Sequence, residues 1–279
     1  MSDAAAFRIM GVVNVTPDSF SDGGRYLDTA IAIEHGLELD AEGAAILDVG
    51  GESTRPGAAP VSETEELRRV IPVIEGLVAG GTNAQISIDT YKSGVASRAL
   101  ASGATLVNDV TALRGDPEIA GVVAEANADC CLMHMLGDPR TMQQDPRYGD
   151  VVNEVKAFLE KRMAFAIANG IAEERILLDP GIGFGKTVAH NLELLRRLGE
   201  FLDLGRPVVI GTSRKSFLGK ITGREVDERV AATVATNVLA YERGARVFRV
   251  HDVAPVHDAL AVTAATVSAR WTTPTSTTR

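Results

Sequence analysis

Cysteine and basic side chains are both scarce in this sequence, and each shortage excludes a class of protein. Only two of its 279 residues are cysteines, Cys130 and Cys131, which are adjacent in an apolar run. Adjacent cysteines suit neither a disulfide framework nor the ligand spacing of a zinc site. The formal net charge of -9, with 28 Lys and Arg against 37 Asp and Glu, argues against a broad nucleic-acid surface. Net charge does not exclude a basic pocket for a phosphate ligand in one cleft.

Long apolar runs are also missing. No run reaches the length of a membrane span, and residues 1–8 lack the charged-then-apolar pattern of a secretory signal. We therefore expect a cytoplasmic protein whose two thiols are buried and reduced. The length suits one large domain, which we place at residues 1–271. The Thr-, Pro- and Ser-rich residues 272–279 predict a disordered tail.

Short apolar runs instead recur along the whole chain. They are expected to be strands, at residues 7–15, 44–51, 85–90, 105–110, 129–135, 175–181, 207–213 and 246–253. Each run is apolar throughout, which is typical of strands that are buried on both faces of a parallel sheet.

Segments with helix-like spacing lie between these runs, for example at residues 29–43 and 151–170. Glycines are placed where four of the helices should end, at Gly43, Gly103, Gly170 and Gly244. Eight repeats of strand and helix predict an α/β fold, a single-domain (β/α)8 TIM barrel. A doubly wound open sheet is the structural alternative.

Polar side chains interrupt nearly every apolar run at its carboxyl end. They are Asn14, Asp48, Asp89, Asn108, Asp109, His134, Asp179, Ser213, Arg214, Lys215, Arg249, His251 and Asp252. A helix N-cap explains one such residue but not almost all of them. In a (β/α)8 barrel these ends meet at one rim, where active sites are built, so we expect a polar ligand pocket there.

Two long connections follow the first two expected strands, at residues 14–26 and 50–62. They are rich in Gly, Pro, Ser and Asp, as mobile lids and binding loops often are. A solvated spacer is the alternative, but Phe20 and the pair Arg55 and Pro56 are unusual in a spacer. A third glycine-rich stretch, GFGK at residues 183–186, is too short to identify a phosphate-binding loop.

The residue types at the rim suit two kinds of ligand. Asp89, Asn108 and Asp179 can hydrogen-bond a flat heterocycle rich in N–H donors, which would also offset the cost of burying the two carboxylates. Basic and amide side chains suit an anionic partner such as a diphosphate: Lys215, Arg249 and His251 supply positive charge, and Asn14 supplies an oxygen ligand for Mg²⁺. Taken singly, Asp89 could instead cap a helix and Arg249 could pair with a rim carboxylate.

Eight segments of the chain together resemble dihydropteroate synthases. They are GVVNVTPDSFSDGG from Gly11, DVGGESTRPGA from Asp48, SIDT from Ser87, NDV from Asn108, LMHM from Leu132, LDPGIGFGK from Leu178, GTSRKSFLG from Gly211 and RVHDV from Arg249. The first two are long and specific, and all eight follow the order of the family. None departs from the family at a position used for chemistry.

The resemblance implies three neighbouring sites. A pterin slot deep in the barrel is implied at Asp89, Asn108, Val110, Met133, Asp179, Phe184 and Lys215. A diphosphate site is implied at Asn14, Arg249 and His251, with Mg²⁺ between the phosphates and Asn14. A p-aminobenzoate site, for which sulfonamides compete in the family, is implied at Phe20, Thr54, Arg55, Pro56 and Ser213, with Lys215 beside it.

The resemblance also implies a reaction, that of a transferase of folate biosynthesis. Such an enzyme condenses 6-hydroxymethyl-7,8-dihydropterin diphosphate with p-aminobenzoate to give 7,8-dihydropteroate and diphosphate, here by dissociative substitution. Asp89, and after it Lys215, is expected to stabilise the developing cation, and the family implies a homodimer through the outer helices. Two alternatives stay open: a pterin-binding barrel such as a methyltetrahydrofolate:corrinoid methyltransferase, and a non-catalytic pterin-binding protein. The methyltransferase would not need the TPDSFSDGG and ESTRPG segments.

Overall fold

Eight strands form a barrel in this computed structural model, which describes residues 6–15, 25–53, 57–138 and 141–269. The strands are β1 (Arg8–Asn14), β2 (Ile46–Gly50), β3 (Gln85–Asp89), β4 (Leu106–Asp109), β5 (Asp129–Met133), β6 (Ile176–Asp179), β7 (Val209–Ile210) and β8 (Val247–Val250). All neighbouring strands are parallel, in the order β6-β5-β4-β3-β2-β1-β8-β7. β1 pairs with both β2 and β8, so β6 and β7 are the two ends of this order, and the contact between them makes the sheet a closed ring rather than an open doubly wound sheet.

The ring closes between β6 and β7 through fewer contacts than elsewhere. An isolated parallel bridge joins Leu178 to Val208, and the Leu178 amide donates to the Pro207 carbonyl at 3.0 Å. β7 covers only two residues, although the sequence predicts a strand over 207–213. Proline has no N–H to donate to a neighbouring strand, so regular pairing begins after Pro207.

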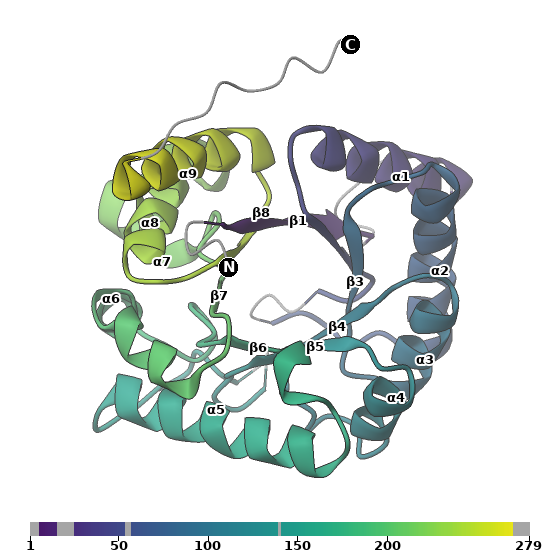
Figure 1. The fold of residues 1–279 in the computed structure, drawn as a ribbon, viewed down its shortest axis with the longest axis horizontal. Helices are drawn as coiled ribbons and strands as arrows, with labels where there is room; N and C mark the ends of the chain where they lie inside the picture. The colour runs from purple at the N-terminus through teal and green to yellow at the C-terminus, as the bar shows by residue number, and fades with distance from the viewer. Residues whose placement is uncertain (1–5, 16–24, 54–56, 139–140, 270–279) are drawn as a thin grey trace.

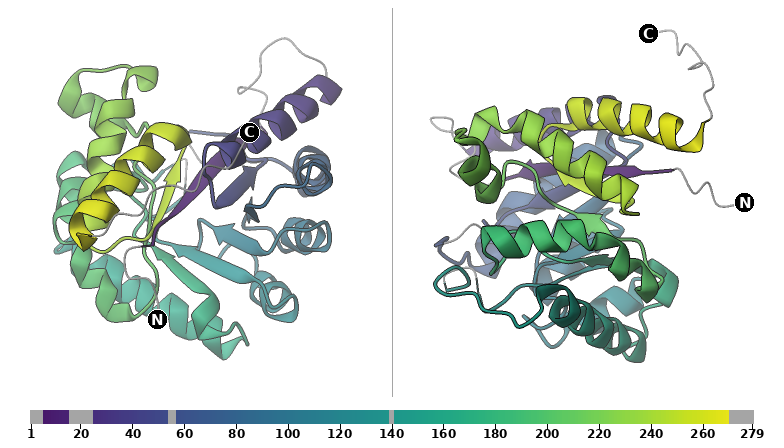
Figure 2. Two further views of the ribbon diagram at one scale, coloured as in Figure 1. Left: turned by 45° about the horizontal axis from the view of Figure 1, so that its top comes forward. Right: turned by 90° about the vertical axis from the view of Figure 1, so that its left-hand side faces the viewer.

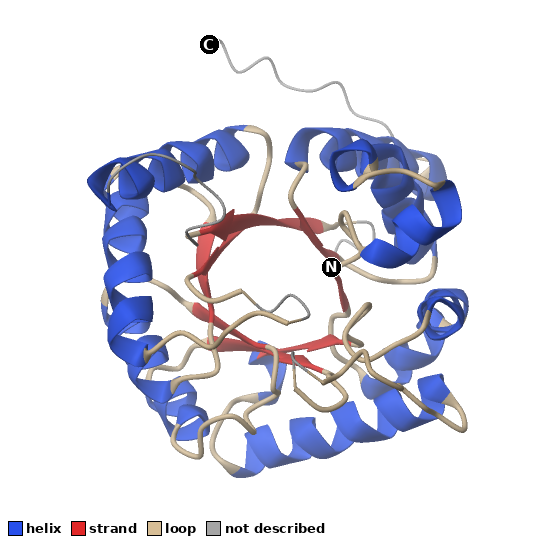
Figure 3. Ribbon diagram, turned by 180° about the vertical axis from the view of Figure 1, so that it is seen from behind, coloured by secondary structure: helices blue, strands red, loops and turns tan. Residues whose placement is uncertain are grey.

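Helices surround the strands as an outer ring (Figures 1 and 3). They are α1 (Arg25–Ala41), α2 (Glu63–Ala79), α3 (Ser93–Ala101), α4 (Ile119–Glu125), α5 (Val151–Ala168), α6 (Val188–Arg196), α7 (Ser216–Thr222), α8 (Val230–Glu242) and α9 (Val253–Ser268). Short 3-10 turns lie at η2 (Glu173–Arg175), η3 (Leu198–Leu204) and η4 (Val226–Glu228). Two helices, α7 and α8, lie between β7 and β8, where the regular repeat has one. The predicted (β/α)8 barrel is confirmed.

The predicted helix ends are confirmed at all four glycines. α1, α3, α5 and α8 each end two residues before one of them, and Gly43, Gly103, Gly170 and Gly244 have φ values of 103°, 118°, 93° and 98°. Only glycine adopts this backbone conformation without steric cost, so these positions turn the chain back towards the next strand. The helix expected at 29–43 begins earlier, at Arg25.

Two apolar layers flank the strands. One residue from each of seven strands fills the inside of the barrel: Met10, Ile46, Leu106, Cys131, Leu177, Val209 and Val247. A larger cluster lies between the strands and the helices and includes Ile9, Leu47, Val107 and Cys130. Adjacent strand residues point to opposite faces, so Cys131 faces the interior and Cys130 faces the helices. Both cysteines are buried and unpaired, as the sequence predicts.

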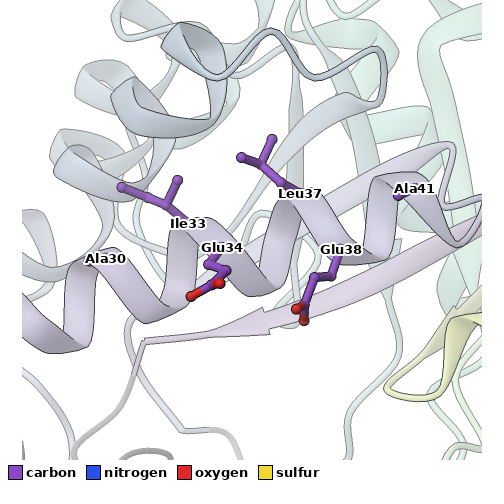
Figure 4. Close-up of a pocket in the computed structure, with 6 residues that line it drawn as sticks. All are labelled: Ala30, Ile33, Glu34, Leu37, Glu38 and Ala41. Atoms are coloured by element: carbon purple, nitrogen blue, oxygen red, sulfur yellow. The ribbon is translucent and has the colours of Figure 1, made fainter. Parts of the chain in front are cut away.

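Figure 2 shows the strands inside the ring of helices from two further directions. One hollow lies on the outer ring, and all six residues that line it belong to α1 (Figure 4). It contains no polar residue of a strand end. No helix within the described ranges is long and apolar enough to cross a membrane. The predicted tail at 272–279 lies outside the described residues.

Candidate active site

The strand alternation places a polar layer directly above the apolar interior of the barrel. Side chains two residues apart on a strand point to the same face. Four strands therefore step from an apolar interior residue to a polar one: Ile46 to Asp48, Leu106 to Asn108, Leu177 to Asp179 and Val247 to Arg249. β3 adds Ser87 and Asp89 by the same step. The polar residues lie toward the carboxyl ends of the strands, where barrel enzymes have their active sites.

Arg249 connects two of the carboxylates in this layer. Its Nε donates to Asp48 Oδ2 at 2.6 Å, and its Nη2 donates to Asp89 Oδ2 at 2.8 Å. Asp48 also accepts from Ser87 Oγ at 2.6 Å and from Asn108 Nδ2 at 3.0 Å. Asp48 is thus fully buried with its oxygens occupied, whereas Asp89 and Asn108 keep further hydrogen-bonding capacity.

Burial governs the protonation of this cluster. It raises the pKa of Asp89 to about 7, and the nearby carboxylate of Asp48 adds to this effect, although the positive charge of Arg249 opposes it. Burial alone would lower the pKa of Arg249, but Asp48 and Asp89 raise it above its ordinary value. Arg249 is therefore a permanent cation that holds two acidic side chains at the mouth of the barrel.

Asp179 lies on the opposite side of the mouth, at the end of β6. Burial raises its pKa, while the Gly181 amide donates to its Oδ1 at 2.6 Å and opposes that shift. Lys215 approaches from the segment after β7, and its Nζ lies 4.0 Å from the centroid of the Phe184 ring. The cation–π contact stabilises this ammonium group beside the buried carboxylate.

Apolar side chains form one wall of the same space. Val110, Met133, Met135 and Met142 are buried together, with Tyr91 and Phe184 against them. Val110 and Met133 are two residues predicted to wall a pterin slot, and the structure places them beside Phe184. A cavity of about 370 Å³ borders Val110 and Met135 on the side of the loops after β2 and β4.

His251 and Ser213 lie together at the ends of β8 and β7. Ser213 Oγ is 3.0 Å from His251 Nδ1 and accepts from the His251 amide at 3.1 Å. Burial lowers the pKa of His251 to about 3, and the charges of Arg249 and Arg214 contribute to this. This shift favours the neutral imidazole, whereas the sequence predicts that His251 supplies positive charge to a diphosphate. A neutral imidazole can still hydrogen-bond such a ligand.

Asn14 ends β1, next to Gly50 in the register and one strand away from Asp89. Among the described residues no group of three His, Cys, Asp or Glu side chains is arranged to hold a metal ion. Mg²⁺ is commonly held by one or two protein oxygens together with phosphate oxygens and water. The Asn14 amide oxygen, at the carboxyl end of β1, suits such a ligand set.

Not every polar strand end belongs to the mouth. Asp109 accepts from the Thr111 and Leu113 amides, both at 2.7 Å, and so closes the turn after β4. Asp252 binds Arg214, with Oδ1 2.6 Å from Nη2. Asp109 and Asp252 therefore stabilise the fold and do not face the ligand space at the mouth. Four residues expected at the aminobenzoate site, namely Phe20, Thr54, Arg55 and Pro56, lie outside the described residues.

Sequence reasoning missed the central role of Asp48. It was recognised only as a polar strand end, yet it accepts hydrogen bonds from three side chains of the layer. The signal was available: Asp48 interrupts an apolar run two residues after Ile46 and therefore shares its face.

Comparison with known proteins gives a consistent result. Residues 10–251 match the family described as pterin binding enzyme. The dihydropteroate synthase of Escherichia coli (strain K12) is 45% identical over 262 residues, which cover 94% of this chain and 92% of that protein. The Mycobacterium leprae enzyme of the same name is 47% identical over 268 residues and 94% of each chain.

Solved structures agree with the sequence relatives. Xanthomonas albilineans dihydropteroate synthase with 4-aminobenzoic acid superposes with a TM-score of 0.89 at 50% identity, covering 95% of this chain and 94% of that one. The same enzyme in complex with 7,8-dihydropteroate gives a TM-score of 0.86 at 48% identity, covering 95% of each chain. The chain therefore belongs to the pterin-binding enzymes and, within them, to the dihydropteroate synthase family, the transferases of folate biosynthesis.

Proposed function

We propose that the mouth of this barrel joins 6-hydroxymethyl-7,8-dihydropterin diphosphate to p-aminobenzoate, and that the residues described above divide the work. One observation carries the proposal: Asp48, Asp89, Asn108, Asp179, Lys215 and Arg249 come from six segments of the chain and gather at one end of the barrel. Two solved structures of the Xanthomonas albilineans relative hold 4-aminobenzoic acid and 7,8-dihydropteroate, which are a substrate and the product of this reaction.

The pterin ring binds against Asp89, Asn108 and Asp179. Two carboxylates and an amide, all buried, match the row of N–H donors and ring nitrogens on one edge of a pterin. The face of the ring lies along Val110, Met133 and Phe184, and Lys215 contacts its remaining edge. Desolvated carboxylates without a ligand are costly, so a ligand that donates to them binds tightly.

The diphosphate lies toward Asn14, Arg249 and His251. Arg249 supplies fixed positive charge, although Asp48 and Asp89 offset part of it. His251, whose pKa is lowered by burial, would hydrogen-bond a diphosphate oxygen. Mg²⁺ held by Asn14 and the phosphate oxygens would neutralise charge on the leaving group.

The aminobenzoate binds between the loops after β1 and β2, against Phe20, Thr54, Arg55 and Pro56, with Ser213 and Lys215 on the barrel side. Sulfonamides compete for this site, in keeping with the Yersinia pestis relative whose structure is described as a sulfonamide drug complex. That relative is 42% identical and superposes with a TM-score of 0.90, covering 95% of this chain and 96% of that one.

The reaction is a dissociative substitution at the pterin methylene. The bond between the methylene carbon and the diphosphate oxygen breaks first, and its electron pair leaves with the diphosphate. Asp89 faces the cation that develops on the pterin and stabilises it electrostatically. The aniline nitrogen then bonds to the methylene carbon and loses a proton, so the protein forms no covalent intermediate.

The helices α7, α8 and α9 support a homodimer. Figure 1 shows them together at one corner of the outer ring, and they expose Ile221, Leu239, Val262 and Val267. Exposed apolar side chains that gather into one patch mark protein interaction surfaces, and we place the contact between subunits at this corner. Sedimentation equilibrium is expected to give twice the mass of one chain.

The activity is tested by adding both substrates and Mg²⁺ to the purified protein and following diphosphate release and 7,8-dihydropteroate formation. The two products are expected in equal amounts, with release dependent on aminobenzoate and abolished by a chelator. The alternatives give other results. A non-catalytic pterin-binding protein would bind the pterin and release nothing, and a methyltransferase barrel would not consume aminobenzoate.

A further inference from the structure

The glycine-rich segment after β6, residues 181–186, forms a tight loop beside the proposed pterin slot. Gly181, Gly183 and Gly185 have φ values of 68°, 86° and 64°, which other residues rarely adopt. A side-chain carbon at Gly181 would meet the His134 carbonyl at 1.9 Å. The loop is thus closely packed against the end of β5, and its shape is fixed by its surroundings.

One buried and one half-buried side chain, rather than regular strand pairing, hold this loop. Asn191 on α6 accepts from the Gly183 amide at 2.8 Å, and the hydroxyl of Tyr148 donates to the Gly185 carbonyl at 2.9 Å. Asn191 is 2% exposed, so water cannot replace its hydrogen bond. These contacts fix the backbone on both sides of Phe184.

Lys186 holds the remaining carbonyl. Its Nζ donates to the Phe184 carbonyl at 3.0 Å and lies 2.9 Å from His134 Nδ1. The side chain is only 3% exposed, and burial lowers its pKa to about 7. An amine that is nearly sealed from solvent does not reach a substrate, yet it joins the ends of β5 and β6 at the point where Phe184 projects.

The loop in turn determines where Lys215 lies. The Phe184 ring is 4.0 Å from Lys215 Nζ, and a side-chain carbon at Gly183 would meet Lys215 Cδ at 3.1 Å. Lys215 therefore rests on the loop along its length. A shift of the loop by even 1 Å would move both the aromatic wall and the cation of the proposed pterin slot.

We infer that Lys186 and Asn191 are positioning residues for pterin binding, which fix the loop at 181–186 and thereby Phe184 and Lys215. Lys186 donates from one side and Asn191 accepts from the other, and neither contacts the substrate. The inference rests on the proposed pterin site.

The test is the dissociation constant of 6-hydroxymethylpterin, followed by its fluorescence in the absence of aminobenzoate. Lys186→Met keeps the length and apolar stem of the side chain but removes its donor, and about tenfold weaker binding is expected. Asn191→Leu is expected to weaken binding by a similar factor, whereas Asn191→Asp keeps an oxygen acceptor and is expected to restore most of the affinity. Lys161→Met, at an exposed position of α5, is the matched control and is expected to bind as the parent does.

The dissociation constant refers to folded protein only, so it separates positioning from stability. Unchanged pterin affinity in folded Lys186→Met and Asn191→Leu would overturn the inference, whatever their melting temperatures. If Lys186→Met does not fold, the comparison of Asn191→Leu with Asn191→Asp decides alone, and equal affinity of the two would also overturn it. Failure of the parent protein to bind the pterin would instead refute the proposed pterin site.

Discussion

Asp89 is the residue at which the site's electrostatics converge. It is almost fully buried and has Arg249 on one oxygen, yet burial raises its pKa more than that cation lowers it. A buried carboxylate interacts most strongly with a ligand that becomes positively charged, because its buried surroundings screen the attraction poorly. The same side chain thus suits the neutral pterin edge and, more strongly, the cation that forms when diphosphate leaves.

Asp89→Asn tests this role at the scale of one side chain. The amide preserves shape and one acceptor but removes the charge, so kcat is expected to fall about 100-fold or more while the melting temperature stays near that of the parent. Steady-state kinetics with both substrates and a thermal melt provide the measurements. Asp145→Asn, at an exposed carboxylate paired with Arg147, is the control. Near-normal turnover in Asp89→Asn would remove the electrostatic role.

The sequence predicted which residues lie at the site better than it predicted which of them contact one another. Asp89, Asn108, Asp179 and Lys215 stand out because a polar residue at the end of a buried strand is costly unless it is used. Asp48 was left without a role, because its partner Arg249 is 201 residues away and only the closure of the ring brings them together. Burial, which no local pattern reveals, lowers the pKa of His251 and favours its neutral form, so the positive charge expected of it stays a prediction.

At the scale of elements, the loop after β2 is tied to the barrel by a buried ion cluster. Lys92, which precedes α3, contacts both Glu52 at the base of the loop and Glu66 on α2. Glu52 also accepts from Tyr91 Oη at 3.1 Å and from the Val61 amide at 3.3 Å, so it holds both ends of the loop. Strands and helices were predictable from their apolar runs and glycines, but this cluster joins three elements and follows no spacing rule.

Lys92→Met is expected to destabilise the protein by about 3 kcal/mol, because it leaves two largely buried carboxylates without their cation. Urea unfolding at pH 7 measures the change. Lys156→Met is the matched control: Lys156 pairs with Asp203, whose side chain is 71% exposed, so its loss is expected to cost less than about 1 kcal/mol. Equal stability of the two variants would show that the cluster contributes no more than a surface ion pair.

At the scale of the whole molecule, the free energy of unfolding depends on pH through His134, which follows β5. His134 is buried beside Lys186 and Arg114, and burial lowers its pKa from 6.5 to about 2. The folded state therefore keeps this imidazole neutral while the unfolded chain binds a proton below about pH 6.5. Because the pKa is lower in the folded state, stability from this residue is present above pH 6.5 and is lost as the pH falls toward 2. The buried acid Asp89 acts in the opposite direction between its ordinary pKa and about 7.

His134→Gln isolates the contribution of the histidine, since Asp89 is common to both proteins. The amide oxygen of glutamine can accept from Lys186 but does not titrate. Between pH 7 and pH 5 the parent is expected to lose about 2 kcal/mol more unfolding free energy than the variant, which is the cost of the proton that only the unfolded histidine binds over that range. Urea unfolding at both pH values gives the two differences. Equal losses of unfolding free energy in the parent and the variant would contradict this prediction. They would mean that no proton is taken up at this site on unfolding, so the histidine would be exposed or charged in the folded state.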